Sequence, residues 1–261
     1  MASSRPTDSL RIVSLAPSVT SILIALGGRR HLIGVSKWCA DVADVRGLPR
    51  LGDCWRLEVN EVKRLRPTIV IGSVPYKPEV VAKLLELPAA FIATNPRSLS
   101  DIEADIRLLG RITNRTVAAE NLIREMRRSL LQVARQARRA RRKPRVYCEA
   151  WPNPRIASPP WVRELVEIAG GRMVPAAGQR ITDEAVARAK PEVIVLAWAA
   201  TGDRAKPSKA LENPAWQDVP AIRSGRVVVV RDELLNTPGP PLLQGAAALL
   251  RAIHPELAAP K

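Results

Sequence analysis

Aromatic side chains are the groups in this sequence best suited to contacting a ligand. The chain has six tryptophans and two tyrosines but one phenylalanine, so aromatic residues that follow predicted strands are informative. Flat rings bury well against a large ligand face, and open α/β sheets bind ligands beyond the carboxyl ends of their strands. We therefore predict ligand contacts at three residues that follow apolar runs: Tyr76, Trp151 and Trp198. For any one tryptophan, core packing is the alternative, and we favour it for Trp161 and Trp216.

Groups that would indicate catalysis are not evident in the sequence. There is no Gly-x-Ser-x-Gly elbow and no phosphate-binding loop, and the first predicted turn, Ala16-Pro17-Ser18, lacks the glycines of a dinucleotide site. With only His31 and His254 available, a histidine-rich metal site is improbable. We therefore predict a protein that is not an enzyme and that carries no cofactor or structural metal.

The three cysteines, Cys39, Cys54 and Cys148, are too few and too widely spaced for a zinc cluster or a disulfide framework. We interpret them as buried thiols. A disulfide between Cys39 and Cys54 is the alternative in an oxidising compartment, and the sequence leaves it open.

The positive charge of the chain is concentrated in one segment. The formal net charge is +16, and residues 116–143 hold nine lysines and arginines against two glutamates. No RNA-binding aromatic motif, zinc finger or helix-turn-helix pattern lies beside this segment. We interpret it as the solvated face of a helix and predict no nucleic-acid partner.

The first part of the chain alternates predicted strands with predicted helices. Strands are expected at 11–15, 32–35, 68–71 and 89–93, and helices at 18–26, 60–65 and 79–85, with Ser18 as an N-cap. This alternation predicts a parallel α/β sheet with helices on both faces.

From residue 100 the pattern becomes helical, with a break near 111–114. Between Thr116 and Lys143, apolar residues recur every three or four positions, which predicts one helix of roughly 40 Å that ends at Pro144. Its narrow apolar stripe suits a helix that bridges two domains.

The α/β alternation then resumes, with strands expected at 145–149, 193–196 and 226–230 and helices at 160–169, 182–189 and 241–253. We therefore predict an N-terminal α/β lobe at 1–113, a linking helix at 114–143 and a C-terminal α/β lobe at 144–261.

Two segments of the chain echo each other. Asn60-Glu61 precedes Arg66-Pro67 and an apolar strand, and Asp183-Glu184 precedes Lys190-Pro191 and another. Helix, proline and strand recur by chance in α/β proteins, and acidic residues also suit helix starts. The matching acidic residues near both helix starts nevertheless favour two equivalent lobes.

These motifs resemble a class of periplasmic substrate-binding proteins that includes cobalamin-, siderophore- and haem-binding proteins. The resemblance runs from about Arg11 to Ile253 and is carried by the opening residues 11–20, Gly47-Leu48-Pro49, and Pro67 and Pro191 with their strands. It implies two Rossmann-like lobes joined by one long rigid helix, with a ligand captured in the cleft between them. It also implies a monomer that delivers this ligand to an ABC permease in the membrane.

The resemblance assigns further site residues. Trp55 matches a cleft tryptophan of the family, and Glu61, six residues later, resembles the first-lobe carboxylate that docks on the permease. Glu184 resembles the second-lobe docking carboxylate. The chain departs from cobalamin binders at Gly178, where they have tryptophan, and at Leu234 and Leu235, where they have aromatic residues.

We take a cobalamin-like corrinoid as the expected ligand. Haem and ferric siderophores are the alternatives within the family. Residues 1–10 leave no room for the apolar region of a signal peptide. We therefore expect either a periplasmic or extracytoplasmic protein whose export signal was removed, or a cytoplasmic tetrapyrrole carrier.

Overall fold

The chain divides into two α/β units. The computed structural model describes residues 10–53, 56–73, 77–202 and 204–258. The first unit comprises Met1–Asn95 with Glu103–Ile123, and the second comprises Pro96–Ile102 with Arg124–Lys261. This is the two-lobed α/β class that the alternation of strands and helices predicts. The finer boundaries at residues 113 and 143 remain a prediction.

The first unit contains a five-stranded parallel sheet in the order β3-β2-β1-β4-β5. Its strands are β1 (Ile12–Ser14), β2 (Leu32–Ser36), β3 (Arg50–Leu51), β4 (Ile69–Ser73) and β5 (Ala90–Thr94). Strand order reverses between β1 and β4, and ligands of open α/β sheets bind at such a switch point, beyond the carboxyl ends of the strands. The edge at which β1 and β4 end is therefore the candidate ligand-binding edge of this sheet.

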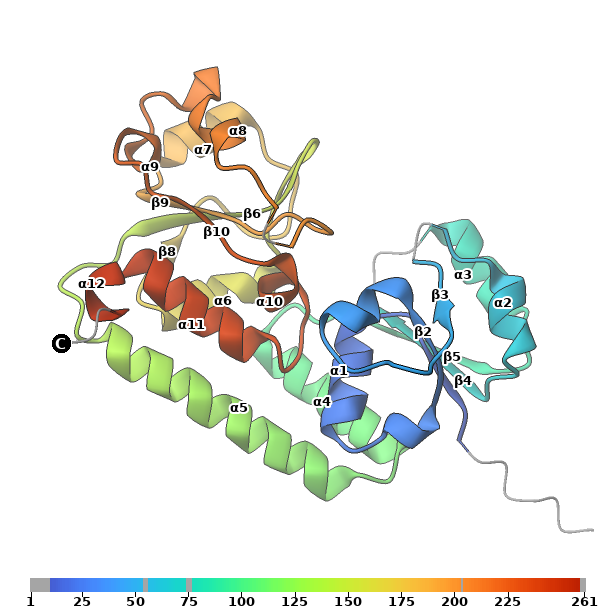
Figure 1. Ribbon diagram of the computed structural model, residues 1–261. Helices are drawn as coiled ribbons and strands as arrows, with labels where there is room; N and C mark the ends of the chain where they lie inside the picture. Colours follow the sequence, from blue (N-terminus) through green and yellow to red (C-terminus); the bar gives the residue numbers. More distant parts are fainter. Residues whose placement is uncertain (1–9, 54–55, 74–76, 203, 259–261) are drawn as a thin grey trace, which may run out of the picture. The chain divides into compact units, whose positions relative to one another are not determined.

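The helices of the first unit lie on both faces of its sheet, with α1 on one face and α2 and α3 on the other (Figure 1). They are α1 (Pro17–Ala25), α2 (Val59–Arg64) and α3 (Pro78–Leu85), with short 3-10 turns η1 (Arg29–His31) and η2 (Lys37–Asp41). Helix α4 (Leu99–Ile112) begins in the second unit and belongs to the first from Glu103 onward. The prediction that Ser18 caps α1 is wrong. Ala16 occupies the N-cap and Pro17 begins the helix, a position where the missing N–H of proline has no cost.

Helix α5 (Thr116–Ala137) begins in the first unit and ends in the second. Its 22 residues span about 33 Å, and the predicted apolar stripe is buried at Ala119, Leu122, Met126, Val133 and Ala137. The prediction that the helix continues to Lys143 is wrong. The stripe ends at Ala137, and without further apolar burial the arginine-rich residues after it do not extend the helix.

The second unit has a mixed sheet in the order β10-β9-β6-β7, with β8 also paired to β6. Its strands are β6 (Arg145–Pro152), β7 (Arg155–Ala157), β8 (Arg172–Met173), β9 (Val193–Leu196) and β10 (Val227–Val229). Only the β6–β7 pair, among the described strands, is antiparallel. The strand predicted to end at Glu149 therefore runs three residues further and turns back as a hairpin, so Trp151 lies on β6 rather than beyond it.

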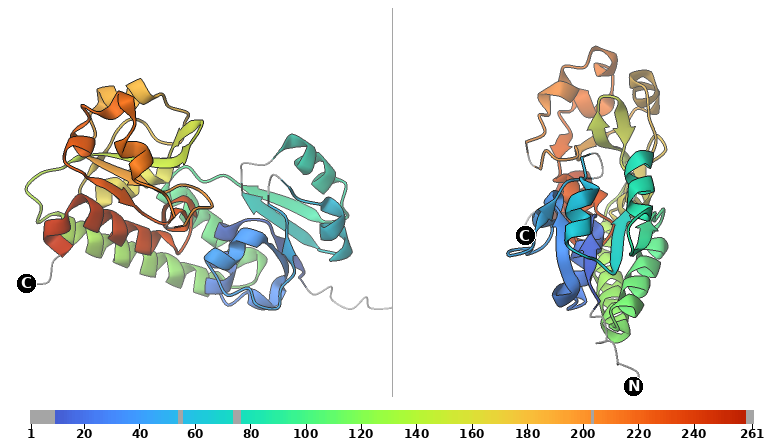
Figure 2. Two further views of the ribbon diagram at one scale, coloured as in Figure 1. Left: turned by 45° about the horizontal axis from the view of Figure 1, so that its top comes forward. Right: turned by 90° about the vertical axis from the view of Figure 1, so that its right-hand side faces the viewer.

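The helices of the second unit also form two layers. Helices α6 (Pro160–Ile168) and α11 (Leu242–Ile253) pack together on one face of the sheet. The other face carries α7 (Asp183–Ala189), α8 (Ser208–Leu211) and α9 (Pro220–Arg223), with the turn η3 (Pro214–Trp216). Figure 2 shows these layers from two further sides. Short helices α10 (Asp232–Asn236) and α12 (Pro255–Ala258) complete the unit.

The sequence echo has a backbone counterpart. Each unit has a short helix followed by a buried strand, α2 before β4 and α7 before β9. Arg66 and Lys190, directly before the two prolines, adopt left-handed φ values of 47° and 48°. Few non-glycine residues adopt this conformation, so its repetition indicates that the two turns are built alike.

Candidate functional site

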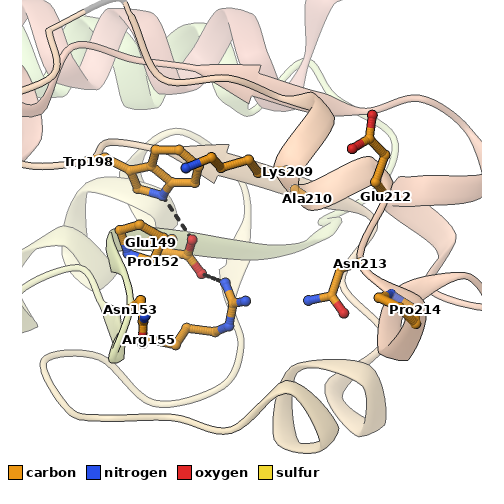
Figure 3. Close-up of a pocket in the computed structure, with 10 residues that line it drawn as sticks. All are labelled: Glu149, Pro152, Asn153, Arg155, Trp198, Lys209, Ala210, Glu212, Asn213 and Pro214. Carbon is orange, nitrogen blue, oxygen red and sulfur yellow. Dashed lines mark hydrogen bonds and ion pairs between the residues drawn. The ribbon is translucent and has the colours of Figure 1, made fainter.

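A pocket of about 460 Å³ lies in the second unit where β6 and β9 end. This is the edge of a parallel sheet at which α/β proteins bind ligands. Figure 3 shows its lining residues: Glu149, Pro152, Asn153, Arg155, Trp198, Lys209, Ala210, Glu212, Asn213 and Pro214. They come from the β6–β7 hairpin, from the segment after β9, and from α8 and the residues that follow it.

The carboxylate of Glu149 is fully buried at the side of this pocket. Its Oε1 accepts a hydrogen bond from Trp198 Nε1 at 2.8 Å, and its Oε2 accepts one from the Tyr147 hydroxyl at 2.8 Å and another from Arg155 Nη1. A buried charge is tolerated when it is paired and hydrogen-bonded in this way. Burial, followed by the negative charge of Glu149, raises the pKa of Tyr147 far above its usual value. Tyr147 therefore acts here as a hydrogen-bond donor.

Arg155 connects the pocket to its surroundings. Its side chain is 16% exposed, and besides Glu149 it pairs with Asp183 through Nε and Oδ1 at 2.9 Å. Its guanidinium also lies over the indole of Trp216, with 4.3 Å from Cζ to the ring centroid. Burial acts to lower the pKa of Arg155, but the charges of Glu149 and Asp183 outweigh it and the net shift is upward. Arg155 is therefore a fixed cation.

The two described tryptophans predicted to contact ligand occupy different environments. Trp198 is 5% exposed and forms one wall of the pocket, with Lys209 Nζ 5.9 Å from its ring centroid. Trp151 is 40% exposed and does not line the pocket, although Pro152 and Asn153 beside it do. Its indole N–H donates to the Asn153 carbonyl at 2.7 Å, which orients the ring while leaving it exposed. Their roles in binding remain predictions.

Two other predicted ligand contacts, Trp55 and Tyr76, lie outside the residues that the structure describes. Trp161 and Trp216, for which core packing was favoured, are 8% and 0% exposed. Their indole N–H groups donate to backbone carbonyls of Leu235 and Asp183. The interpretation of both as core residues is confirmed.

Trp38 is a further exposed tryptophan, which was not among the predicted ligand contacts. This residue lies in η2, directly after β2 at the carboxyl edge of the first sheet, and is 36% exposed. Its Nε1 donates to Asp53 Oδ2 at 3.2 Å, and Lys37 Nζ lies 4.8 Å from its ring centroid. The sequence holds the pattern that would have identified Trp38, because this residue follows a predicted strand just as Trp198 does. The pairing of Glu149 with Arg155 had no comparable signal.

Glu61 and Glu184, the predicted docking carboxylates, are both exposed and both lie in the first turn of a helix, α2 and α7. Thr182 caps α7, because its hydroxyl oxygen accepts a hydrogen bond from the Ala185 N–H at 3.2 Å. Hydrogen bonds from its own backbone N–H and from Thr182 lower the pKa of Glu184. Glu184 is thus ionised and available to a cationic partner at neutral pH, and docking itself remains a prediction.

Two of the three cysteines lie among the described residues. Cys39 and Cys148 are free and buried, and burial raises the pKa of both thiols, that of Cys148 to about 12. Cys54 lies outside the described residues. Within the described ranges, histidine, cysteine and acidic side chains do not gather in a group of three that could hold a metal ion. None of the described helices is long and apolar enough to cross a membrane.

Comparison with known families decides the class of protein. The family model described as periplasmic binding protein matches residues 12–234. The chain belongs to this family. Members are binding proteins rather than enzymes, and they deliver small ligands to an ABC permease without carrying a cofactor. They are periplasmic proteins or extracellular lipoproteins.

Three relatives of this periplasmic binding protein illustrate its similarities. The substrate-binding lipoprotein YvrC of Bacillus subtilis is 25% identical, over 94% of this chain and 80% of its own length. The vitamin B12-binding protein of Photorhabdus laumondii is 23% identical, over 94% of this chain and 88% of its own length. A periplasmic haem-binding protein from Pseudomonas aeruginosa, whose structure is solved, is 26% identical in sequence. Its structure aligns over 94% of this chain and 93% of its own chain, with a TM-score of 0.83.

Proposed function

We propose that this periplasmic binding protein captures a flat metal macrocycle, a corrinoid first and haem as the second candidate, and hands it to its permease. The observation that carries the proposal is the exposed indole at the carboxyl edge of each sheet, Trp38 in the first unit and Trp151 in the second. Large exposed indoles with satisfied N–H groups are suited to stacking on a flat ligand. Relatives named for vitamin B12 and haem binding support the same ligand class.

The charge balance of the pocket favours a corrinoid. Its lining carries as many carboxylates as cations, and two asparagines accompany them: Glu149, Glu212, Arg155, Lys209, Asn153 and Asn213. Such a lining offers both donors and acceptors with little net charge. It therefore suits the uncharged carboxamide arms of a corrinoid better than the negatively charged propionates of haem.

Haem is the second candidate because of Tyr76. Tyr76 lies three residues after the end of β4 in the sequence and is outside the described residues. Tyrosine is one of the side-chain types that ligate haem iron. A haem-binding protein is expected to shift the Soret band on loading, and Tyr76→Phe is expected to remove that shift. Binding of cyanocobalamin that is unaffected by Tyr76→Phe would favour the corrinoid.

Replacing Trp151 with alanine is expected to weaken ligand binding by roughly 5- to 150-fold, the loss that follows from about 1–3 kcal/mol for a large aromatic contact. Trp38→Ala is expected to act in the same direction. Titration of the purified protein with cyanocobalamin and with haemin, followed by absorbance, measures both effects. Leu131→Ala provides the control, because Leu131 is 45% exposed but lies on α5 rather than on a strand or in the segment after one. Equal affinities for Trp151→Ala and Leu131→Ala would contradict the proposal.

A further inference from the structure

Arg155 lines the pocket and also contacts the first residue of α7, the helix that carries Glu184. Its Nε lies 2.9 Å from Asp183 Oδ1, and Asp183 is the residue directly before Glu184. One guanidinium therefore connects the wall of the pocket to the start of this helix.

Two more contacts hold Asp183 in place. Asn213 Nδ2 donates to Asp183 Oδ1 at 2.9 Å, and Trp216 Nε1 donates to the Asp183 carbonyl at 3.1 Å. Arg155 and Asn213 both line the pocket, and Figure 3 shows the two side chains facing each other across it. A ligand group that enters between them would meet both side chains that hold the carboxylate of Asp183.

The two ion pairs of Arg155 differ in how easily they can be exchanged. Glu149 is 0% exposed, so breaking its pair with Arg155 would leave a buried charge without its counterion. The side chain of Asp183 is 39% exposed and can be hydrated when it is released. An acceptor oxygen of a ligand would therefore displace Asp183 from Arg155 rather than Glu149.

We propose that Arg155 is a positioning residue whose contacts with α7 differ between loaded and empty protein. Ligand oxygen atoms replace Asp183 on Arg155, and this loosens the first turn of α7, where Glu184 lies. The inference rests on the proposed function, because it assumes that the pocket receives part of the transported ligand. It assigns to Arg155 and Asp183 a role in distinguishing loaded from empty protein.

Asp183→Asn is the informative variant, because it weakens the link to α7 and leaves the Arg155–Glu149 pair intact. In ligand-free protein, the backbone amides of residues 183–189 are expected to exchange hydrogen for deuterium about two- to fivefold faster in this variant than in wild type. Asp218→Asn, at an exposed position of the same unit, is the matched control and is expected to leave this exchange unchanged. Equal exchange in Asp183→Asn and wild type would overturn the link.

The second measurement is the same hydrogen–deuterium exchange at saturating cyanocobalamin, repeated separately with haemin. In wild type, loading is expected to raise exchange of residues 183–189 toward the level of Asp183→Asn. In the variant, loading is expected to cause no further rise, and the Kd is expected to be about two- to fivefold lower than in wild type, because the ligand no longer has to displace a carboxylate from Arg155. Normal binding with unchanged exchange in wild type would overturn the inference. Absence of binding by wild type would instead count against the proposed function, so the two failures are distinguishable.

Discussion

Reversing both Glu61 and Glu184 to lysine is expected to abolish ligand delivery while leaving ligand affinity within about twofold. Both carboxylates are exposed in the first turn of a helix, and neither lines the pocket of the second unit. If they meet arginines of the permease, each reversal replaces an attraction with a repulsion, and charge pairs at interfaces are worth several kcal/mol. We expect apparent affinity for the permease to fall by at least about 100-fold.

Stimulation of permease ATPase activity in proteoliposomes measures this effect. The matched control reverses Glu125 and Asp218, two exposed acidic residues, and changes the net charge by the same amount. Because the chain already carries +16, this control separates a specific contact from a general rise in positive charge. Equal stimulation by the Glu61/Glu184 variant and wild type would remove both residues from the docking surface.

Replacing Arg155 with methionine is expected to destabilise the second unit by about 3–5 kcal/mol, the usual cost of leaving one member of a buried ion pair without its partner. Glu149 would keep only the hydrogen bonds from Tyr147 and Trp198. Thermal unfolding followed by circular dichroism should show a midpoint lower by roughly 10 °C.

Two further variants test the cause of this loss. Adding Glu149→Gln to Arg155→Met removes the uncompensated charge and is expected to recover part of the stability. Arg163→Met breaks an exposed ion pair with Glu167, whose side chains are 64% and 57% exposed, and is expected to cost less than about 0.5 kcal/mol. Similar losses for Arg155→Met and Arg163→Met would show that the buried network contributes little.

The fold could be predicted from the sequence because its elements follow simple periodic patterns. Strand β9 matches its predicted range of 193–196, and α6, α7 and α11 differ from their predictions by one residue at each altered end. The hairpin of β6 and β7 was not predicted, because Pro152 and Pro154 argue against strands in this segment. The segment also lacks the alternation of polar and apolar residues that would indicate a strand. The end of α5 was misplaced because arginine has a high helix propensity, although burial ends at Ala137.

The site could be predicted only in part. The rule that tryptophans follow strands singled out Trp198, which lines the pocket, and Trp151, which does not, and it would also have singled out Trp38. The network around Glu149 could not be predicted, because it depends on the hairpin that brings Arg155 back beside residue 149. Glu149 is also the one acidic residue of β6, and a single acidic residue gives no indication of its partner.

Equilibrium dialysis measures directly whether this protein retains the flat metal macrocycle that we propose as its ligand. Purified wild-type protein would be dialysed separately against cyanocobalamin, haemin and a ferric hydroxamate siderophore. We expect one cyanocobalamin bound per chain at micromolar or lower concentration, with haemin as the second candidate and the siderophore retained weakly or not at all. Tight binding of the siderophore, with neither macrocycle retained, would contradict it.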